Sequence, residues 1–435
     1  MIRNYASGKF FILLFIVLLP FCLFSQRSPI DSLENILKTA REDTNKVNIL
    51  IQLSFKILNE GGYDKALGYA MKGKDLAEKL GFKNGMVTSY SDIGRIFKNQ
   101  GDYTQALEYY FKTLKICQEI GNKKGVSYCF SAIGLVYENI DDYPKALDFL
   151  FKALTMEEEF KNKSNMGMLF TNIGITYGKL NADVRNQDNY VNALAFFFKA
   201  LKIAEETGNV KYITTINENI GSVYYEQKDY SLALETYVKT LKIFEDIGDK
   251  KGMQSTNLNT GLVYSEQGDY DKAKESLFRA LKIAEEIGDK SRISESFGAI
   301  ASNYFKQKKY SEVITYGNKS LAIAKEIGLL GEIQKVEEIL SNTYGQTNNT
   351  TQALEHYKKY IIVHDSIFSQ ENAKKEKEAE MKFNYEKKQV AEKIEEEKKE
   401  AIHIERAKGE KNMLYSCIIF ISLIAAFAVY SYRRR

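Results

Sequence analysis

The sequence repeats itself with a period of 40 residues, and this period constrains the fold more than any other feature. One tyrosine marks the same point in successive copies. It occurs as Tyr63, Tyr103, Tyr143, Tyr190, Tyr230, Tyr270 and Tyr310, and an eighth copy has Thr350 at this point. The single longer step, of 47 residues, contains a seven-residue insertion at 181–187. A fixed period in this range is typical of a protein built from stacked repeats.

Each copy also carries a small residue, usually nine positions before the tyrosine, and most copies have an aromatic residue three positions after that small residue. The small residues are Ser54, Gly94, Gly134, Gly174, Gly221, Gly261, Ala301 and Ser341. Two helices approach closely only where one of them offers no bulk, and large rings then fill the space beside the contact. The pattern therefore predicts a pair of packed helices in each copy. Glycines at the expected helix ends, such as Gly81 and Gly288, suit the left-handed conformation of a helix terminus.

This arrangement resembles the tetratricopeptide repeat (TPR) over eight copies. The matching features are the small residue with its aromatic, the alanine three positions after the tyrosine, and a later small residue such as Ala153, Ala200 or Ala280. The tryptophan and terminal proline of the family are absent, and the longer period is similar to that of kinesin light chains and spindle-orienting scaffolds. The resemblance implies an all-α, right-handed superhelix of about eight helix pairs with a concave peptide-binding groove.

Composition agrees with a helical chain and excludes some partners. Only three prolines occur, and Pro144 falls in the first turn of an expected helix, where no hydrogen bond is lost. The formal charge of +4 is close to balance, and charges alternate along the expected helix faces. We therefore expect no nucleic-acid partner.

The N-terminal residues 1–26 have the composition of a secretory signal peptide. Arg3 and Lys9 precede a fifteen-residue apolar run at 10–24, which polar residues follow. An uncleaved anchor is an alternative interpretation. Cys22 is a poor lipidation site because Pro20 and Phe21 before it are not small.

We divide the remaining chain by its composition. Residues 27–44 include a short amphipathic capping helix, and 45–365 form the TPR array of eight repeats. Residues 366–412 form a charged stalk, since 370–412 holds twelve acidic and twelve basic residues. Apolar residues of the stalk, such as Phe383 and Ile394, fit one heptad frame, but Glu380, Lys387, Glu397 and Lys408 interrupt it. A solvated single helix and a weak coiled-coil homodimer both remain open.

The segment 413–432 carries no charge for twenty residues and is long enough to span a bilayer, leaving a stub at 433–435. The three terminal arginines favour a cytoplasmic C-terminus, and the leader independently directs the repeats outward. This predicts a protein of the bacterial inner membrane with a periplasmic TPR array. In that compartment Cys117 and Cys129, which flank one predicted turn, are either two partly buried thiols or a disulfide.

Residues for catalysis are not apparent in the sequence. The three histidines, His356, His364 and His403, lack neighbours at metal-ligand spacing, and no phosphate-binding glycine loop occurs. A phosphoacceptor role for His403 is disfavoured, because the predicted topology places it outside the cytoplasm. We expect no enzymatic activity, no metal and no cofactor.

Asn172, Asn219 and Asn259 occupy the same place, two residues before the small glycine, in three consecutive copies. In TPR proteins this place faces the concave groove, and an amide offers both a donor and an acceptor to a peptide backbone. An exposed helix surface without function is the alternative. Further groove candidates nearby are Arg95, Tyr128, Tyr225 and Glu295.

Together these features predict a membrane-anchored module that binds a peptide or protein, as a periplasmic sensor or scaffold. The chain is similar to the sensory half of bacterial TPR signalling proteins with one membrane span. The alternative is the sensory region of a histidine kinase or cyclase whose output domain is missing from this chain.

Overall fold

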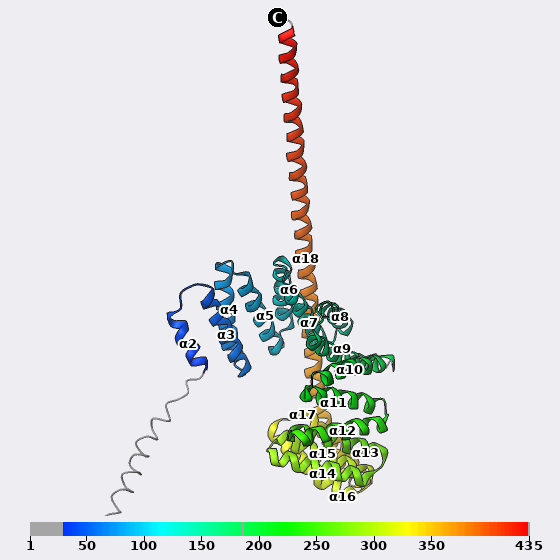
Figure 1. Ribbon diagram of the computed structural model, residues 1–435. Helices are drawn as coiled ribbons and strands as arrows, with labels where there is room; N and C mark the ends of the chain where they lie inside the picture. Colours follow the sequence, from blue (N-terminus) through cyan, green and yellow to red (C-terminus); the bar gives the residue numbers. More distant parts are fainter. Residues whose placement is uncertain (1–28, 185–186, 434–435) are drawn as a thin grey trace, which may run out of the picture. The chain divides into compact units, whose positions relative to one another are not determined.

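The protein is helical throughout the part described by the structure, a computed structural model that covers residues 29–184 and 187–433 (Figure 1). This confirms the predicted all-α repeat fold. The helices of the described part are α2 (Pro29–Thr39), α3 (Thr44–Asn59), α4 (Tyr63–Lys79), α5 (Lys83–Gln100), α6 (Tyr103–Glu119), α7 (Lys123–Asn139), α8 (Tyr143–Glu159), α9 (Lys163–Val184), α10 (Gln187–Glu206), α11 (Val210–Glu226), α12 (Tyr230–Ile247), α13 (Lys250–Gln267), α14 (Tyr270–Ile287), α15 (Lys290–Lys306), α16 (Tyr310–Ile327), α17 (Leu330–Gln346) and α18 (Thr350–Arg433). The predicted signal peptide at 1–26 lies outside the described residues.

The helix ends follow from residues that recur with the repeat. Before α14, the side chain of Asp269 accepts a hydrogen bond from the backbone N–H of Lys272, which would otherwise have no partner. After α14, Gly288 has a φ of +74°, a conformation that side chains rarely adopt. The glycines expected at the other helix ends share this conformation: Gly81, Gly121, Gly208, Gly248 and Gly328.

A small residue on one helix and a large residue on its partner form the central contact of most repeats. A Cβ atom added to Gly221 of α11 would lie 2.5 Å from the Tyr237 ring of α12. The equivalent atom on Gly261 would lie 2.6 Å from Cγ of Leu277. The same relation joins Gly174 to Phe197, at 2.7 Å. The glycines therefore provide the space into which the large side chains pack.

The helix pairs stack in chain order, and the odd-numbered helices lie closest together across the repeats. Consecutive helices from α2 to α17 pack against one another, and α3, α5, α7, α9 and α11 form a series of direct contacts, as do α13, α15 and α17. No contact of similar extent joins successive even-numbered helices within the described residues. A stack that is tighter along one side curves toward that side. We call the exposed strip along the odd-numbered helices the inner face and that along the even-numbered helices the outer face.

The seven-residue insertion at 181–187 lengthens two helices. The helix α9 has 22 residues and α10 has 20, whereas α11 and α12 have 17 and 18. Residues 185–186 between them are outside the described part. The extra residues thus extend this pair at its connection and preserve the register of the repeats that follow.

The chain divides after Ala373 into two compact units, and the described residues of the second unit, 374–433, are the later part of α18. Among its described side chains, Phe383, Val390, Ile394 and Ile404 are exposed. Within this unit the stretch Glu397–Ala426, with a mean hydropathy of 1.2, is long and apolar enough to cross a membrane. It overlaps the uncharged segment singled out in the sequence.

The small-to-large contact can be tested with a pair of glycines. We expect Gly221→Ala to lower the free energy of unfolding by about 1–3 kcal/mol, because the new methyl group overlaps the Tyr237 ring. Gly178→Ala is the matched control on α9, since nothing lies within 4 Å of its added Cβ. The control should stabilise the helix by about 0.5–1 kcal/mol. Thermal melting measures both effects. Melting temperatures that shift in the same direction for the two variants would contradict this packing.

Candidate functional site

The three predicted asparagines lie at equivalent points of α9, α11 and α13, and all three side chains are half-buried. Their side-chain amides form no hydrogen bond with another described residue, although the backbone oxygen of Asn172 accepts one from Thr176 at 2.8 Å. None of their amide atoms is completely enclosed. Each amide is therefore shielded by its neighbours but still available to a ligand.

Helical spacing places these amides on the inner face. Lys179, seven residues after Asn172, contacts Glu138 of α7 at 2.8 Å. Glu266, seven residues after Asn259, contacts Lys306 of α15 at 2.7 Å. Because seven residues are close to two helical turns, Asn172 and Asn259 lie on the side of their helices that meets neighbouring odd-numbered helices, and Asn219 has the equivalent place in α11.

Arg95 of α5 is the centre of the first charged group on the inner face. Its Nη2 donates to Oδ1 of Asp92 at 2.8 Å, and the guanidinium lies 5.0 Å from the centre of the Phe55 ring of α3. The Nε of Arg95 is buried and has no partner. Burial raises the pKa of Asp92 to about 6, and the charge of Arg95 opposes this rise. Arg95 thus keeps one donor free at a partly desolvated position.

The same charged group continues across α7 and α9. Glu138 is largely buried, accepts a hydrogen bond from Lys179 at 2.8 Å and lies 3.3 Å from the hydroxyl of Thr176. Burial lowers the pKa of Lys98, and the nearby Arg95 charge adds to that effect. Charges of both signs therefore alternate along this part of the inner face.

A second polar group lies on α11, α13 and α15. Arg292 donates to Gln254, whose side chain is completely buried. Burial raises the pKa of Glu218 on α11, with Asp249 adding to the rise and Arg292 opposing it. Glu218 and Gln254 lie on the same helices, α11 and α13, as Asn219 and Asn259.

The structure brings only some of the other predicted residues together. Tyr128 of α7 is 47% exposed and lies within electrostatic range of Arg95. Tyr225 of α11 packs against Tyr230 with ring centres 6.0 Å apart, and burial raises its pKa to about 12. Glu295 of α15 accepts a hydrogen bond from Ser291 at 3.1 Å. Arg95 and Tyr128 thus form one group, whereas Tyr225 and Glu295 lie on separate helices.

Sequence reasoning missed Asp92, Glu138, Glu218 and Arg292. Asp92 was recognisable, because it lies two residues before Gly94 and so occupies the asparagine place in an earlier copy. The others carried no signal, since their partners come from different repeats and only the stacking brings them together.

Other features of the described residues do not form a reactive centre. No group of three or more His, Cys, Asp or Glu side chains in the described part is arranged to hold a metal ion. Cys117 and Cys129 are buried free thiols, and burial raises the pKa of both. The thiol interpretation of this pair is the one that the structure shows.

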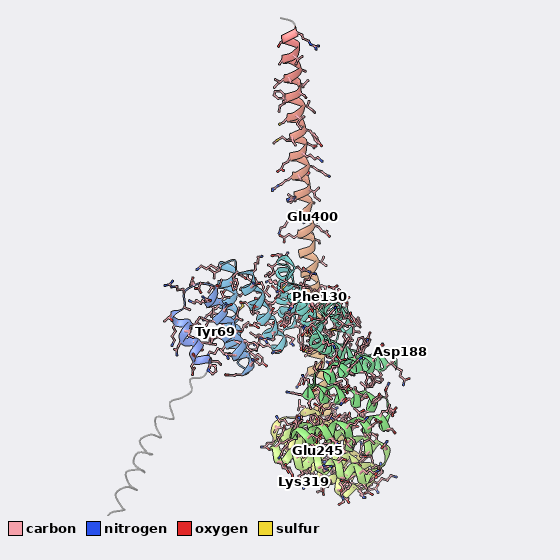
Figure 2. The ribbon with its side chains drawn as sticks, viewed as in Figure 1. Tyr69, Phe130, Asp188, Glu245, Lys319 and Glu400 are labelled. Carbon is pink, nitrogen blue, oxygen red and sulfur yellow. The ribbon has the colours of Figure 1, made fainter. Side chains whose placement is uncertain are left out.

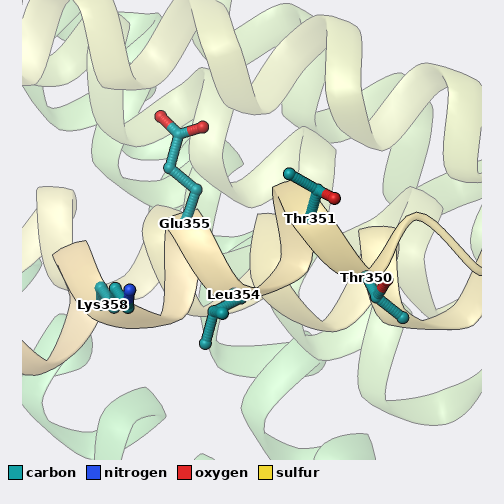
Figure 3. A pocket seen from close by; sticks show the side chains of 5 residues that line it. All are labelled: Thr350, Thr351, Leu354, Glu355 and Lys358. Atoms are coloured by element: carbon teal, nitrogen blue, oxygen red, sulfur yellow. The ribbon is translucent and has the colours of Figure 1, made fainter.

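An open hollow of about 480 Å³ lies along the start of α18, bordered by five of its side chains (Figure 3). Glu355 and Thr351 point to one side of the helix and Leu354 to the other (Figure 3). The side chains do not converge on one point, so this hollow is a weaker candidate than the inner face.

Comparison with known proteins supports the repeat assignment. A tetratricopeptide repeat model matches residues 85–159 and 252–326. These two stretches of the chain therefore consist of tetratricopeptide repeats. No curated protein matches the sequence.

Solved structures with the same fold include three that align over most of this chain. A signal transduction ATPase with a tetratricopeptide repeat sensor from Pyrococcus horikoshii has a TM-score of 0.58 and 15% identity, covering 81% of this chain and 53% of its own. Aspartyl phosphate phosphatase F from Bacillus subtilis has a TM-score of 0.55 and 14% identity, with coverage of 84% and 95%. The apo quorum sensor NprR from B. thuringiensis has a TM-score of 0.52 and 15% identity, with coverage of 77% and 92%. At these identities the similarity shows a shared fold.

The raised pKa of Asp92 predicts a pH dependence of stability. Because its pKa rises from an ordinary 3.8 to about 6 on folding, the folded state binds this proton more tightly. The free energy of unfolding should therefore fall by about 2–3 kcal/mol as pH rises from 4 to 7. Asp92→Asn should remove this part of the dependence in melting curves recorded across that range. Asp271→Asn, at an exposed position of α14, is the control. If the wild type and the Asp92 variant show equal pH dependence of stability, the raised pKa of Asp92 is contradicted.

Proposed function

We propose that the protein is a non-enzymatic binding module that holds an extended peptide segment along its inner face. The observation that carries the proposal is the set of equivalent amides at Asn172, Asn219 and Asn259, which are half-buried and form no hydrogen bond with another described residue. Their regular placement on three successive odd-numbered helices suits a ligand that runs along the stack.

The chemistry of the amide explains how such a site would grip different sequences. An asparagine side chain donates from its nitrogen and accepts at its oxygen, which matches the C=O and N–H groups of a peptide backbone. Because the backbone is common to every peptide, the asparagines would supply affinity and leave selectivity to their neighbours.

The charged groups of the inner face supply that selectivity. The Arg95 side chain is partly exposed beside Phe55 and Tyr128, and its positive charge favours a ligand that presents a carbonyl or carboxylate oxygen there. Toward the other end of the array, Glu218 is desolvated and favours a cationic or hydrogen-bond-donating ligand group. We therefore expect the bound peptide to carry groups of both signs.

We further propose that the module is anchored in the bacterial inner membrane with its repeats in the periplasm. The apolar stretch of α18 and the three C-terminal arginines support this topology. Two of the structural neighbours are named as sensors, and a sensor or scaffold role is our proposal for this chain. Pairing of two stalks into a homodimer remains a prediction from the heptad frame.

The groove proposal predicts a loss of peptide affinity when the amides are removed. Peptides selected on the wild-type protein from a random displayed library should bind the triple variant Asn172→Ala, Asn219→Ala, Asn259→Ala more weakly by about one to three decades. Each lost amide bond removes about 0.5–1.5 kcal/mol, and 1.4 kcal/mol corresponds to one decade. Titration calorimetry with the selected peptides measures this loss.

Asn318→Ala provides the matched control, because this exposed asparagine lies on the even-numbered helix α16. Its affinity for the same peptides should equal that of the wild type. If the triple variant folds, by its melting curve, and binds the peptides as tightly as the control does, the amides do not hold the ligand.

The proposed topology predicts the result of protease treatment. Protease added to spheroplasts should digest the repeats and leave a small fragment in the membrane, because only the end of α18 is protected by the bilayer. Antibodies against tags placed at 45 and at the C-terminus distinguish the two parts. Repeats that stay intact until the membrane is lysed would contradict the proposed orientation.

A further inference from the structure

Paired aromatic rings occupy the same position in five repeats. In each of them the ring three residues after the small residue stacks against a ring on the following even-numbered helix. The ring centres are 5.9 Å apart for Phe97–Tyr109, 5.6 Å for Tyr137–Phe149, 5.9 Å for Tyr177–Phe196, 5.6 Å for Tyr304–Tyr316 and 5.3 Å for Tyr344–His356. We call this series the ring ladder. Tyr69, which takes the same place in α4, and Lys319, beside the ladder on α16, are labelled in Figure 2.

The ladder rings also cover apolar side chains of the preceding repeat. The ring of Phe149 meets Phe111 of α6 with centres 5.9 Å apart, and the ring of Phe196 meets Phe151 of α8 at 5.7 Å. Both covered side chains are only partly exposed. Phe149 and Phe196 thus each cover two apolar neighbours, one in their own repeat and one in the repeat before.

The ladder is interrupted at two adjacent repeats. Thr236 of α12 and Ser276 of α14 occupy the places where the other repeats have a ring. The side chains that a ring would cover are exposed there, Phe198 of α10 by 48% and Val238 of α12 by 52%. Two neighbouring positions on the outer face therefore lack the aromatic cover that the same fold provides elsewhere.

A row of basic side chains borders the two uncovered positions. Every repeat has Lys or Arg nine residues after its marker residue, and in this region Lys199, Lys239 and Arg279 continue the row. A second row adds Lys202, Lys242 and Lys282, all exposed. Lys239 pairs with Glu235 at 2.6 Å and Arg279 with Glu245 at 3.3 Å, whereas Lys199 and the second row form no direct ion pair with a described residue.

Elsewhere in the ladder the same basic row lies against aromatic rings. The Lys152 ammonium lies 4.8 Å from the centre of the Phe149 ring, and that of Lys319 lies 5.4 Å from Tyr316. Such contacts are attractive because the ring face carries partial negative charge. At α12 and α14 the cations are present but the rings are missing, so Lys239 and Arg279 border apolar side chains that no ring covers.

We propose that this interruption is a second docking site, which accepts an acidic peptide segment of a partner protein carrying aromatic side chains. Two rings of the partner take the places left by Thr236 and Ser276 and cover Phe198 and Val238. Acidic residues beside those rings meet the unpaired lysines. The charge complementarity and the covering seen in neighbouring repeats both specify this occupant.

The proposal is independent of the inner face, because every residue involved belongs to the even-numbered helices α10, α12 and α14. Acidic residues interspersed with the basic ones, among them Glu206, Glu235, Glu245, Glu275 and Glu286, disfavour a continuous phosphate backbone at this surface. They leave room for separate carboxylates beside the unpaired lysines. A peptide with spaced acidic residues therefore fits the charge pattern better than a nucleic acid does.

The experiment compares two polymeric probes on the full chain in detergent micelles. A random copolymer of glutamate and tyrosine should bind the wild type at least about tenfold more tightly than polyglutamate, because only the copolymer supplies rings. The double variant Thr236→Phe, Ser276→Phe fills both uncovered positions with rings of the protein itself. It should lose this preference and retain the weaker, salt-sensitive binding of polyglutamate.

Control variants separate the site from general effects. Asn318→Phe adds a ring to the outer face of α16 without filling either position, and it should keep the preference for the copolymer. The triple asparagine variant of the inner face should also keep it. If the filled variant melts below the wild type, Phe198→Ser provides a second test, because it removes the apolar contact and should abolish the preference without adding bulk.

Equal binding of the two polymers by the wild type would overturn the proposal. So would a filled variant that folds and still prefers the copolymer. Anionic lipid vesicles, oligothymidylate and a second copy of the chain are tested in the same way. If one of these binds the wild type but not the filled variant, and the copolymer is not preferred, the surface belongs to that other occupant and the peptide is rejected.

Discussion

The contact between a small residue and a large one is the interaction on which the rest of the structure depends. Gly221 leaves room for the Tyr237 ring, which a Cβ atom at this position would overlap, and Gly261 does the same for Leu277. Where the first residue is Ala301, the residue at the partner position is Gly317, so this contact is small on both sides. Packed interiors tolerate little change in volume. This contact therefore fixes the register of each helix pair, and the repetition of the register aligns the inner and outer faces.

The periodic part of the fold could be predicted from the sequence because its determinants are local. The marker tyrosine, the small residue and the glycine at the helix end recur in most copies, and each has a physical role that does not depend on distant parts. The insertion was visible only as a longer step, and the structure shows it as two extended helices, α9 and α10. The oligomeric state of the stalk depends on a second chain, which a broken heptad frame does not specify.

The candidate sites were only partly predictable, because they combine residues from different repeats. Equal placement in three copies identified Asn172, Asn219 and Asn259, and a search over all copies would also have found Asp92. The pairing of Glu138 with Lys179 depends on how α7 and α9 stack, and no spacing in the sequence encodes it. The outer site was not predicted, because charges alternate along the helices and no single residue marks it. It is recognised only by two rings that are missing from an otherwise regular ladder.

A crystal structure of the full chain with a library-selected peptide tests the central claim most directly. The account predicts an extended peptide along the odd-numbered helices, with its backbone N–H and C=O groups about 2.7–3.2 Å from the amides of Asn172, Asn219 and Asn259. A carbonyl or carboxylate oxygen of the peptide should lie beside the Arg95 guanidinium. A peptide bound on the even-numbered helices, or on the inner face with all three amides unengaged, would contradict the account.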